Sequence, residues 1–246
     1  MLKLNDIIVR YTRQGPAVLD HLHLNVGAGE RVALVGPSGS GKTTLLRTIN
    51  ASVAAESGQV WVGDVEVTRT RGAALRKIRS RIAFIAQKHD LVDRLKVYQN
   101  VMAGALGRWS TAHALRFLMR PKASELEEAS EALDSVNLRE KLRVRTAEIS
   151  GGQQQRVAIA RALIQSPLII LADEPVASLD PENAAQVMEL LCGLAKSRGM
   201  TLLCSLHQPE LARRYFDRLL RIENGQVVPV PPPPVAGSRH AAYVPC

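Results

Sequence analysis

Cysteines, aromatic residues and long apolar runs are all scarce in this chain of 246 residues, and each scarcity excludes a class of protein. The three cysteines, Cys192, Cys204 and Cys246, fall in no paired spacing, so we expect free thiols in a reducing compartment rather than a disulfide framework. Aromatic residues make up 4% of the chain, which argues against a surface that stacks the bases of single-stranded nucleic acid. The longest apolar run, residues 167–172, is far shorter than the roughly 18 to 20 residues of a membrane span. The first residues also lack the apolar core of a signal peptide, so we expect a soluble, cytosolic protein.

Acidic residues are also few, with 23 acids against 32 lysines and arginines and a net charge of +9. The densest basic stretch, residues 69–81, holds six basic residues and no acid, and it is expected to form an amphipathic helix that leads into a strand. Such a charge run is typical of a solvated face. The alternative is a face held near a membrane or an acidic partner, and the net charge of +9 is also compatible with binding to nucleic acid or an anionic lipid surface.

The order of apolar patterns predicts an α/β chain of one domain, with or without a subdomain. Alternating runs predict strands at 2–11, 19–26 and 59–67, and apolar runs predict buried strands at 31–36, 81–87, 168–174 and 200–206. Helices are expected at 42–50 and 181–199, and a mainly helical insertion at 96–165. After residue 228 the chain becomes proline-rich, which predicts an extended or disordered tail.

The stretch "GPSGSGKT", residues 36–43, fits the phosphate-binding pattern G-x-x-x-x-G-K-[ST] between a buried strand and a helix. Its glycines let backbone N–H groups approach phosphates, where a Cβ atom would obstruct them. Lys42 then supplies a positive charge to the β and γ phosphates, and the Thr43 hydroxyl supplies a ligand for Mg²⁺. The alternative, an ordinary glycine turn, does not explain the lysine and threonine in this context.

Polar residues that suit phosphate chemistry follow three other predicted strands. Asp173 and Glu174 end the apolar strand at 168–174; the first would hold Mg²⁺ through its water shell, and the second would polarise the attacking water. Gln87 and His207 end two further strands, where open α/β sheets bind their ligands. Gln87 would sense Mg²⁺ or water and His207 would reach the γ-phosphate, although each is also typical of an ordinary polar residue at a strand end.

A second phosphate-binding device occurs at residues 148–156, "EISGGQQQR". Ser150 is a suitable N-cap residue, and the glycines after it expose backbone N–H groups at the start of a helix. One domain with one nucleotide has no evident need for two such devices.

Together these motifs make the chain resemble the ATP-binding subunits of ABC transporters over residues 2–228. The loop at 36–44 is similar to the Walker A motif of that family, and the strand at 168–174 is similar to its Walker B motif. The signature motif of the family resembles residues 149–156, its D-loop resembles residues 178–180, and its switch-histidine motif resembles residues 205–208. Gln87 matches the glutamine of its Q-loop. Ile149 stands where that family usually has leucine. The resemblance implies an ABC-type P-loop NTPase core with a mostly parallel sheet, an antiparallel β subdomain, and a helical subdomain inserted at about 88–166 of a domain spanning 1–228, followed by a tail at 229–246.

The resemblance also implies which residues act, and on what. ATP and Mg²⁺ are the expected cofactors, and Tyr11, in an early strand, matches the aromatic residue that stacks on adenine. The expected ATP-binding residues are Tyr11, Gly36, Pro37, Ser38, Gly39, Ser40, Gly41, Lys42, Thr43 and Thr44. Glu174, His207 and Gln87 are the expected catalytic residues, and Thr43, Gln87 and Asp173 the expected Mg²⁺ ligands. In this family two copies pair head to tail, so the signature residues of one copy would cap the ATP held by the other. The expected signature residues are Ser150, Gly151, Gly152 and Gln153. The expected D-loop residues, which would lie beside them, are Ser178, Leu179 and Asp180.

Residues 90–107, "DLVDRLKVYQNVMAGALG", are similar to phosphonate-type importer subunits. The resemblance therefore implies a homodimer bound to transmembrane permease subunits at the cytoplasmic face of the cell (inner) membrane, served indirectly by a periplasmic or extracellular substrate-binding protein. Another cargo, such as an amino acid or a lipoprotein, stays open. We expect no nucleic-acid partner, because the alternative of an ABC ATPase acting on nucleic acid would bring fused ATPase halves or a long coiled coil.

Overall fold

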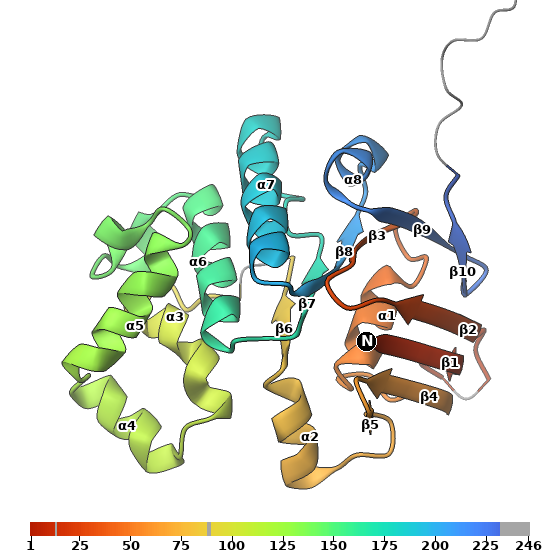
Figure 1. Cartoon of the computed structure of the whole chain (residues 1–246), viewed down its shortest axis with the longest axis horizontal. Helices are drawn as coiled ribbons and strands as arrows, with labels where there is room; N and C mark the ends of the chain where they lie inside the picture. The colour runs from red at the N-terminus through yellow and green to blue at the C-terminus, as the bar shows by residue number, and fades with distance from the viewer. Residues whose placement is uncertain (13, 88–89, 232–246) are drawn as a thin grey trace, which may run out of the picture.

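The computed structural model describes residues 1–12, 14–87 and 90–231, which form two sheets and a separate helical lobe (Figure 1). The predicted tail lies outside these residues from 232 onwards. Among the described residues, no helix is both long and apolar enough to cross a membrane.

The larger sheet has six strands in the order β10-β9-β3-β8-β7-β6. Its strands are β3 (Arg31–Val35), β6 (Ile82–Ile85), β7 (Ile169–Asp173), β8 (Thr201–Leu206), β9 (Arg218–Glu223) and β10 (Gln226–Pro229). All neighbours pair in parallel except β10, which is antiparallel to β9. Because parallel strands end at the same edge, the residues that follow β3, β6, β7 and β8 are brought together there.

The smaller sheet is antiparallel, in the order β2-β1-β4-β5. Its strands are β1 (Leu2–Val9), β2 (Leu19–Val26), β4 (Ser57–Val62) and β5 (Val65–Glu66). The single strand expected at 59–67 is instead a hairpin, because Gly63 has a φ of 59° and turns the chain between β4 and β5. Valines occur on both sides of this turn, at positions 60, 62, 65 and 67, which is why the sequence pattern concealed it.

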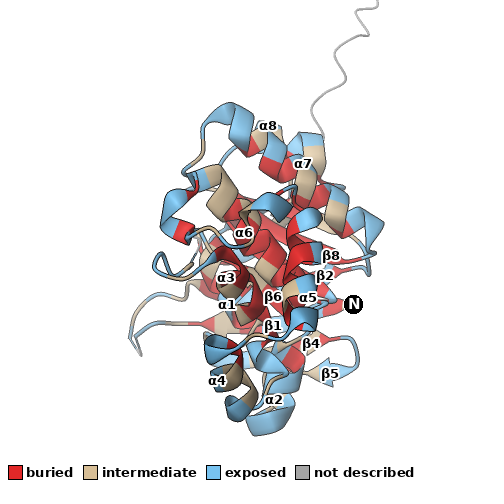
Figure 2. Cartoon of the chain, turned by 90° about the vertical axis from the view of Figure 1, so that its left-hand side faces the viewer, coloured by how far each residue is buried: buried red, intermediate tan, exposed pale blue. Residues whose placement is uncertain are grey.

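Two hydrophobic cores sandwich the larger sheet. Val32 and Leu34 of β3 enter one core, shared with the antiparallel sheet and α1 (Lys42–Ile49). Ala33 and Val35 enter the other, shared with the helices. Side chains of a strand alternate between faces, so the continuous apolar runs of this sheet reflect burial on both sides. Figure 2 shows the buried residues gathered in the interior and along the inner faces of the helices.

The remaining helices form the lobe and the covering layer. They are α2 (Gly72–Arg79), α3 (Val97–Met102), η1 (Ala103–Gly107), α4 (Thr111–Met119), α5 (Ala123–Asp134), η2 (Arg139–Lys141), η3 (Thr146–Glu148), α6 (Gly151–Ile164), α7 (Pro181–Ser197) and α8 (Pro209–Tyr215). Helices α3 to α6 make the lobe to the left in Figure 1, and α2 lies below the sheet. The predicted fold class, a parallel-sheet core with an antiparallel β part and a helical part, is confirmed.

Candidate functional site

The glycine loop joins β3 to α1 at the carboxyl edge of the sheet, as predicted. Gly41 has a φ of 101°, and a Cβ atom there would lie 3.1 Å from the backbone oxygen of Val18, so only glycine fits. The Oγ atom of Ser40 is buried and has no hydrogen-bond partner among the described residues, so it has an unused bond to offer within the loop.

Lys42 is folded back against the loop. Its Nζ atom donates hydrogen bonds to the backbone oxygens of Gly36 (2.9 Å) and Pro37 (3.0 Å), and the side chain is 4% exposed. Burial lowers the pKa of Lys42, while the nearby carboxylates of Glu174 and Asp173 oppose that shift. A phosphate group would therefore meet a cation that has few competing water contacts.

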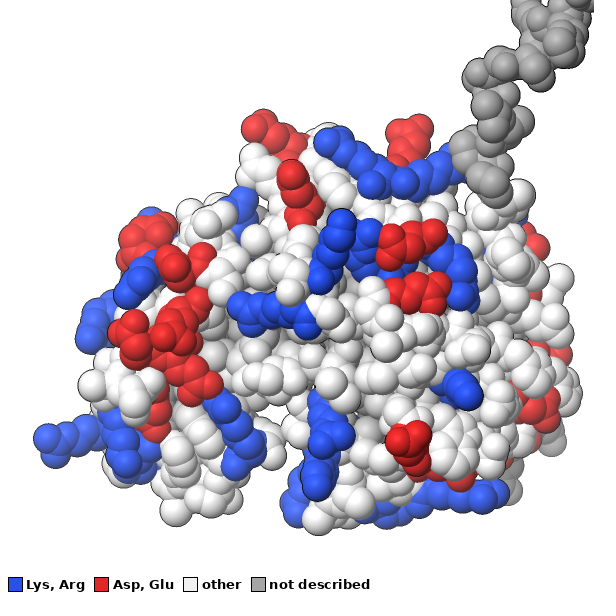
Figure 3. Space-filling view, viewed as in Figure 1, with Lys and Arg blue, Asp and Glu red and all other residues white. Residues whose placement is uncertain are grey.

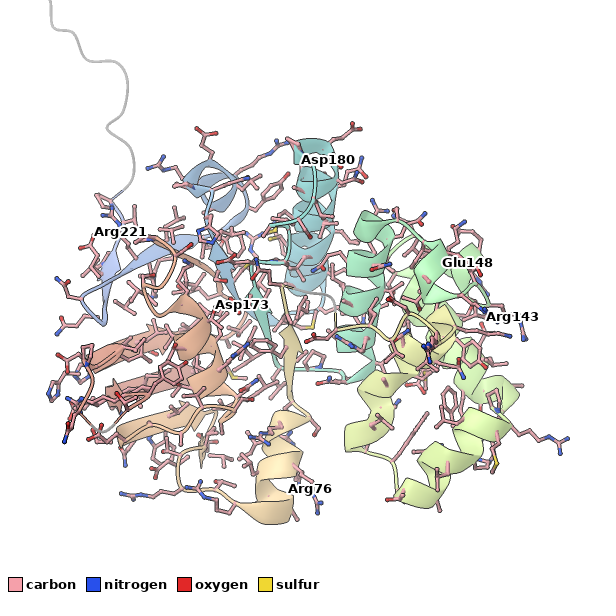
Figure 4. All side chains as sticks on the ribbon, turned by 180° about the vertical axis from the view of Figure 1, so that it is seen from behind. Arg76, Arg143, Glu148, Asp173, Asp180 and Arg221 are labelled. Atoms are coloured by element: carbon pink, nitrogen blue, oxygen red, sulfur yellow. The ribbon has the colours of Figure 1, made fainter. Side chains whose placement is uncertain are left out.

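Asp173 ends β7 and meets the loop directly (Figure 4). Its Oδ1 atom accepts hydrogen bonds from the Thr43 hydroxyl at 3.0 Å and from the Ser205 hydroxyl at 2.8 Å. Thr43 and Asp173 thus present a hydroxyl and a carboxylate side by side, which are oxygen ligands of the kind Mg²⁺ prefers. No group of three or more His, Cys, Asp or Glu suited to a metal occurs in the described part of the chain.

Glu174 and His207 form the second polar pair of the site. His207 Nε2 lies 2.5 Å from Glu174 Oε1, and Lys42 Nζ lies 3.9 Å from the same oxygen. Glu174 has a φ of 48°, in the left-handed region that non-glycine residues seldom adopt. Such strain is common where a side chain must be aimed at a reacting centre.

A pocket of about 520 Å³ unites most of the predicted ATP-binding residues with the predicted catalytic residues Gln87, Glu174 and His207. It is lined by Tyr11, Val18, Ser38, Gly39, Gly41, Lys42, Thr43, Thr44, Gln87, Glu174, Ala177 and His207. Tyr11 lies beyond the end of β1 rather than within a strand, because β1 ends at Val9. Tyr11 is 62% exposed and lines the pocket, and its hydroxyl lies 2.9 Å from Thr44 Oγ1. A flat, open aromatic ring here suits stacking on a base.

The signature residues lie elsewhere. Ser150 caps α6 with a reciprocal capping box, in which Gln153 N donates to Ser150 Oγ (3.3 Å) and Ser150 N donates to Gln153 Oε1 (3.0 Å). None of the residues 150–153 is among those that line the glycine-loop pocket. Figure 4 shows Glu148, just before this cap, on the helical lobe, well apart from Asp173. The chain therefore does not bring its own two phosphate devices together.

The D-loop lies beside the signature. Asp180 caps α7, since its carboxylate accepts from Asn183 N (3.1 Å) and Asn183 Nδ2 (2.6 Å), and these bonds lower the pKa of Asp180. A Cβ atom on Gly152 would lie 3.2 Å from Asn183 Oδ1. Residues 150–153 and 178–180 are thus neighbours on one surface.

Two features were missed by sequence reasoning. The first is Ser205, whose hydroxyl contacts Asp173; a serine inside an apolar strand gave no signal. The second is a groove of about 850 Å³ between α2 and η1, lined by Arg76, Arg79, Ser80, Ala103, Gly104, Leu106, Gly107, Arg108, Trp109, Ser110, Thr111 and Gln165. Figure 3 shows it as a notch in the lower margin, with lysine and arginine side chains on both sides. Its arginines come partly from the basic stretch at 69–81.

Comparisons with known proteins agree with this geometry. A family model described as "ABC transporter" matches residues 19–177. The chain is 50% identical over 210 residues to the "Phosphonates import ATP-binding protein PhnC" of Frankia casuarinae, covering 85% of this chain and 82% of the relative. It is 47% identical over 219 residues to the protein of that name from Hyphomonas neptunium, covering 87% of this chain and 80% of the relative. A solved dimeric ATP-binding cassette in a post-hydrolysis state, bound to ADP and Pi, superposes with a TM-score of 0.76 at 31% identity, covering 92% of this chain and 96% of that one.

Proposed function

The chain belongs to the ABC transporter family, and from this premise we propose how its residues use ATP to drive the import of phosphonates or related phosphorus oxyanions. It is an ATP-binding subunit that hydrolyses ATP to power a transporter. The observation that carries the proposal is that the glycine loop, Gln87, Glu174 and His207 meet in one pocket at the carboxyl edge of the sheet. The names of the relatives, import proteins for phosphonates, support the choice of cargo.

In this proposal ATP binds with its phosphates in the glycine loop and its base against Tyr11. Backbone N–H groups of residues 38–44 hold the phosphate oxygens, and Lys42 leaves the carbonyls of Gly36 and Pro37 to pair with the β and γ phosphates. Thr43, Asp173 and Gln87 would hold Mg²⁺, which offsets charge on the phosphates when bound. Positioning and charge compensation do most of the work in phosphoryl transfer, because the transition state is loose.

Glu174 would then polarise the attacking water, and His207 would contact the γ-phosphate. In the structure these side chains bond to each other at 2.5 Å. ATP would have to separate them, because His207 must turn toward the phosphate and Glu174 toward the water. Nucleotide binding thus prepares both groups together.

Two copies of the chain would pair head to tail around two ATP molecules. The separation of residues 150–153 from the pocket of the same chain supports this arrangement, as does the dimeric relative with bound ADP. Ser150, Gly151, Gly152 and Gln153 would cap the γ-phosphate held by the partner, beside Ser178, Leu179 and Asp180. ATP binding then closes the dimer and hydrolysis weakens it, which is a two-state element biased by a ligand.

Permease subunits are the remaining direct partners implied by an import ATPase. We propose that they dock at the groove between α2 and η1, because Arg76 and Arg79 make its α2 side positively charged, which suits an acidic segment. Arg79 is fixed there by hydrogen bonds to the backbone oxygens of Asn50 and Ala51, and Arg108 on the opposite side is paired with Glu128. The position would be peripheral, at the cytoplasmic face of the cell membrane, with a substrate-binding protein acting on the far side. Residues 1–228 would be the ATP-binding domain, with about 88–166 as its helical subdomain and 229–246 as a tail.

The ATPase part is tested with Glu174→Gln. We expect the variant to bind ATP, to hydrolyse it at least about a hundredfold more slowly, as when a general base is lost, and to accumulate as a dimer by light scattering with ATP and Mg²⁺. Monomers under these conditions would contradict the paired arrangement, and hydrolysis at the wild-type rate would contradict the role of Glu174.

The cargo is tested by deleting the gene in its host and supplying a phosphonate, phosphite or phosphate as the sole phosphorus source. We expect growth to be lost on a phosphonate or on phosphite, retained on phosphate, and restored by the wild type but not by Glu174→Gln. Unchanged growth on all three, in a host with no second copy of the system, would exclude this cargo class and leave an ABC ATPase for another solute such as an amino acid.

A further inference from the structure

Ser205 is a fully buried serine in a strand whose one other hydroxyl residue, Thr201, lies at its start. It lies on β8, has no exposed surface, and faces Asp173 in the parallel register of β7 and β8. A hydroxyl in such a place must find partners, because an unpaired buried polar group is costly. Its partners are the two acids that the proposed mechanism uses.

The Ser205 hydroxyl makes two hydrogen bonds. It donates to Asp173 Oδ1 at 2.8 Å and accepts from Glu174 N at 2.9 Å. The backbone oxygen of Ser205 also accepts from Glu174 N, at 3.2 Å. One side chain therefore fixes the carboxylate of the first acid and the backbone of the second.

The two hydrogen bonds restrain the Asp173 carboxylate and the Glu174 backbone. Thr43 and Ser205 converge on the same carboxylate oxygen, so Asp173 cannot rotate without losing both hydroxyls. Glu174 has a φ of 48°, and its N–H is held in that left-handed conformation by Ser205. The direction of the Glu174 side chain toward His207 follows from this backbone conformation.

We propose that Ser205 is a positioning residue for ATP hydrolysis, acting through Asp173 and Glu174. The inference rests on the roles proposed above for these two acids. Without the hydroxyl, Asp173 keeps only Thr43 as a hydroxyl donor, a contact that Mg²⁺ binding would have to rearrange. Glu174 would keep only the longer bond to the Ser205 backbone. The Ser205 hydroxyl bonds to Asp173 and Glu174 rather than to the glycine loop or Tyr11, so we expect nucleotide binding without Mg²⁺ to depend little on Ser205.

The test compares Ser205→Ala, Ser205→Thr and Ser205→Val. Thr and Val have the same shape and differ in one hydroxyl, so this pair decides the matter even where Ser205→Ala folds poorly. We expect kcat to fall about tenfold to a hundredfold in Ala and Val, the range for losing a hydrogen bond to a charged group, and to stay much closer to the wild-type value in Thr. The Mg²⁺ concentration for half-maximal activity rises in Ala and Val.

Two further measurements separate positioning from stability. Affinity for a fluorescent ATP analogue in EDTA stays within about twofold of wild type, while the gain in affinity on adding Mg²⁺ shrinks in Ala and Val. The matched control is Thr201→Val on the same strand, whose hydroxyl contacts Gly29 N (3.0 Å) and Gly27 O (3.2 Å) away from the site. It should lower Tm and leave kcat and Mg²⁺ dependence unchanged.

Ser205→Ala or Ser205→Val with wild-type kcat and Mg²⁺ dependence would overturn the proposal. So would equal losses in Thr and Val at equal Tm, because the hydroxyl would then contribute nothing. These outcomes differ from failure of the proposed function, in which the wild type lacks Mg²⁺-dependent ATPase activity or Glu174→Gln retains it.

Discussion

Replacing Glu125 with glutamine tests how much the ion pairs of this carboxylate stabilise the helical lobe. Glu125 lies on α5, and its side chain is 9% exposed. The Glu125 carboxylate accepts hydrogen bonds from Arg116 and from Lys122 N, the second at 2.7 Å. Its Oε1 atom also lies 2.7 Å from His113 Nε2. Arg116 and His113 belong to α4, so this carboxylate ties α4 to the start of α5. The hydrogen bond from Arg116 is the main reason that the pKa of Glu125 falls from 4.5 to about 2, against the opposing effect of burial.

The magnitude and its pH window follow from that shift. A drop from 4.5 to about 2, at about 1.4 kcal/mol per unit, sets a ceiling of roughly 3 kcal/mol. The side chains of Arg116 and His113 are 32% and 37% exposed, so solvent screening reduces this to about 1–2 kcal/mol. Because the pKa is depressed in the folded state, the unfolded chain binds a proton first as the pH falls. The stabilisation is complete above about pH 4.5 and is lost progressively toward pH 2.

The assay is urea unfolding of the wild type and Glu125→Gln at several pH values from 7 to 3. We expect the wild type to be more stable by about 1–2 kcal/mol at pH 7, with the gap narrowing below pH 4.5. The matched control is Glu127→Gln on the same helix, where the carboxylate is 61% exposed and lies 3.4 Å from Arg139; it should change stability by less than about 0.5 kcal/mol. A gap that is absent at pH 7, or that stays constant to pH 3, would refute the reasoning.

Three further changes test other parts of the structure. Lys42→Ala should weaken binding of a fluorescent ATP analogue about tenfold to a hundredfold, since a charge-assisted contact to phosphate is lost; an unchanged Kd would contradict this. In a urea titration, Gly104→Ala should lower the free energy of unfolding by about 1–3 kcal/mol or more, because the new Cβ atom would lie 2.1 Å from Arg161 O. Gly107→Ala is the control and should be tolerated, because the atom nearest to its Cβ would lie 3.5 Å away. Burial raises the pKa of Cys192 to about 12, so mapping of alkylated peptides at pH 8 should find Cys192 unmodified until urea is added.

The glycine loop and the polar ends of the strands could be predicted because their chemistry is local. The phosphate pattern needs glycine where Gly41 adopts a φ of 101°, and an apolar run ending in Asp173 marks the edge of a buried strand. Parallel pairing then brings Gln87, Glu174 and His207 together without further information. Their positions around one pocket follow from strand order alone.

Other features depend on contacts that no local pattern records. Ser205 becomes important only through its register opposite Asp173, a pairing between segments that are far apart in sequence. The groove at α2 needs η1 to pack beside it, and η1 is held by the close approach of Gly104 to α6. Position 63 shows the opposite difficulty, since valines on both sides of it resemble one strand although the chain turns there.

The signature shows why one chain carries two phosphate devices. Ser150 and Gly151 are exposed at the start of α6, and Asp180 is exposed at the start of α7. Asn183 links them, since it bonds to Asp180 and packs on Gly152, so both helix starts belong to one rigid surface on the side of the lobe. A capped helix start with open glycines suits an anion, but none of the residues 150–153 is among those that line the glycine-loop pocket of the same chain. This supports the proposed pairing, in which residues 150–153 would contact a nucleotide held by a second copy of this chain.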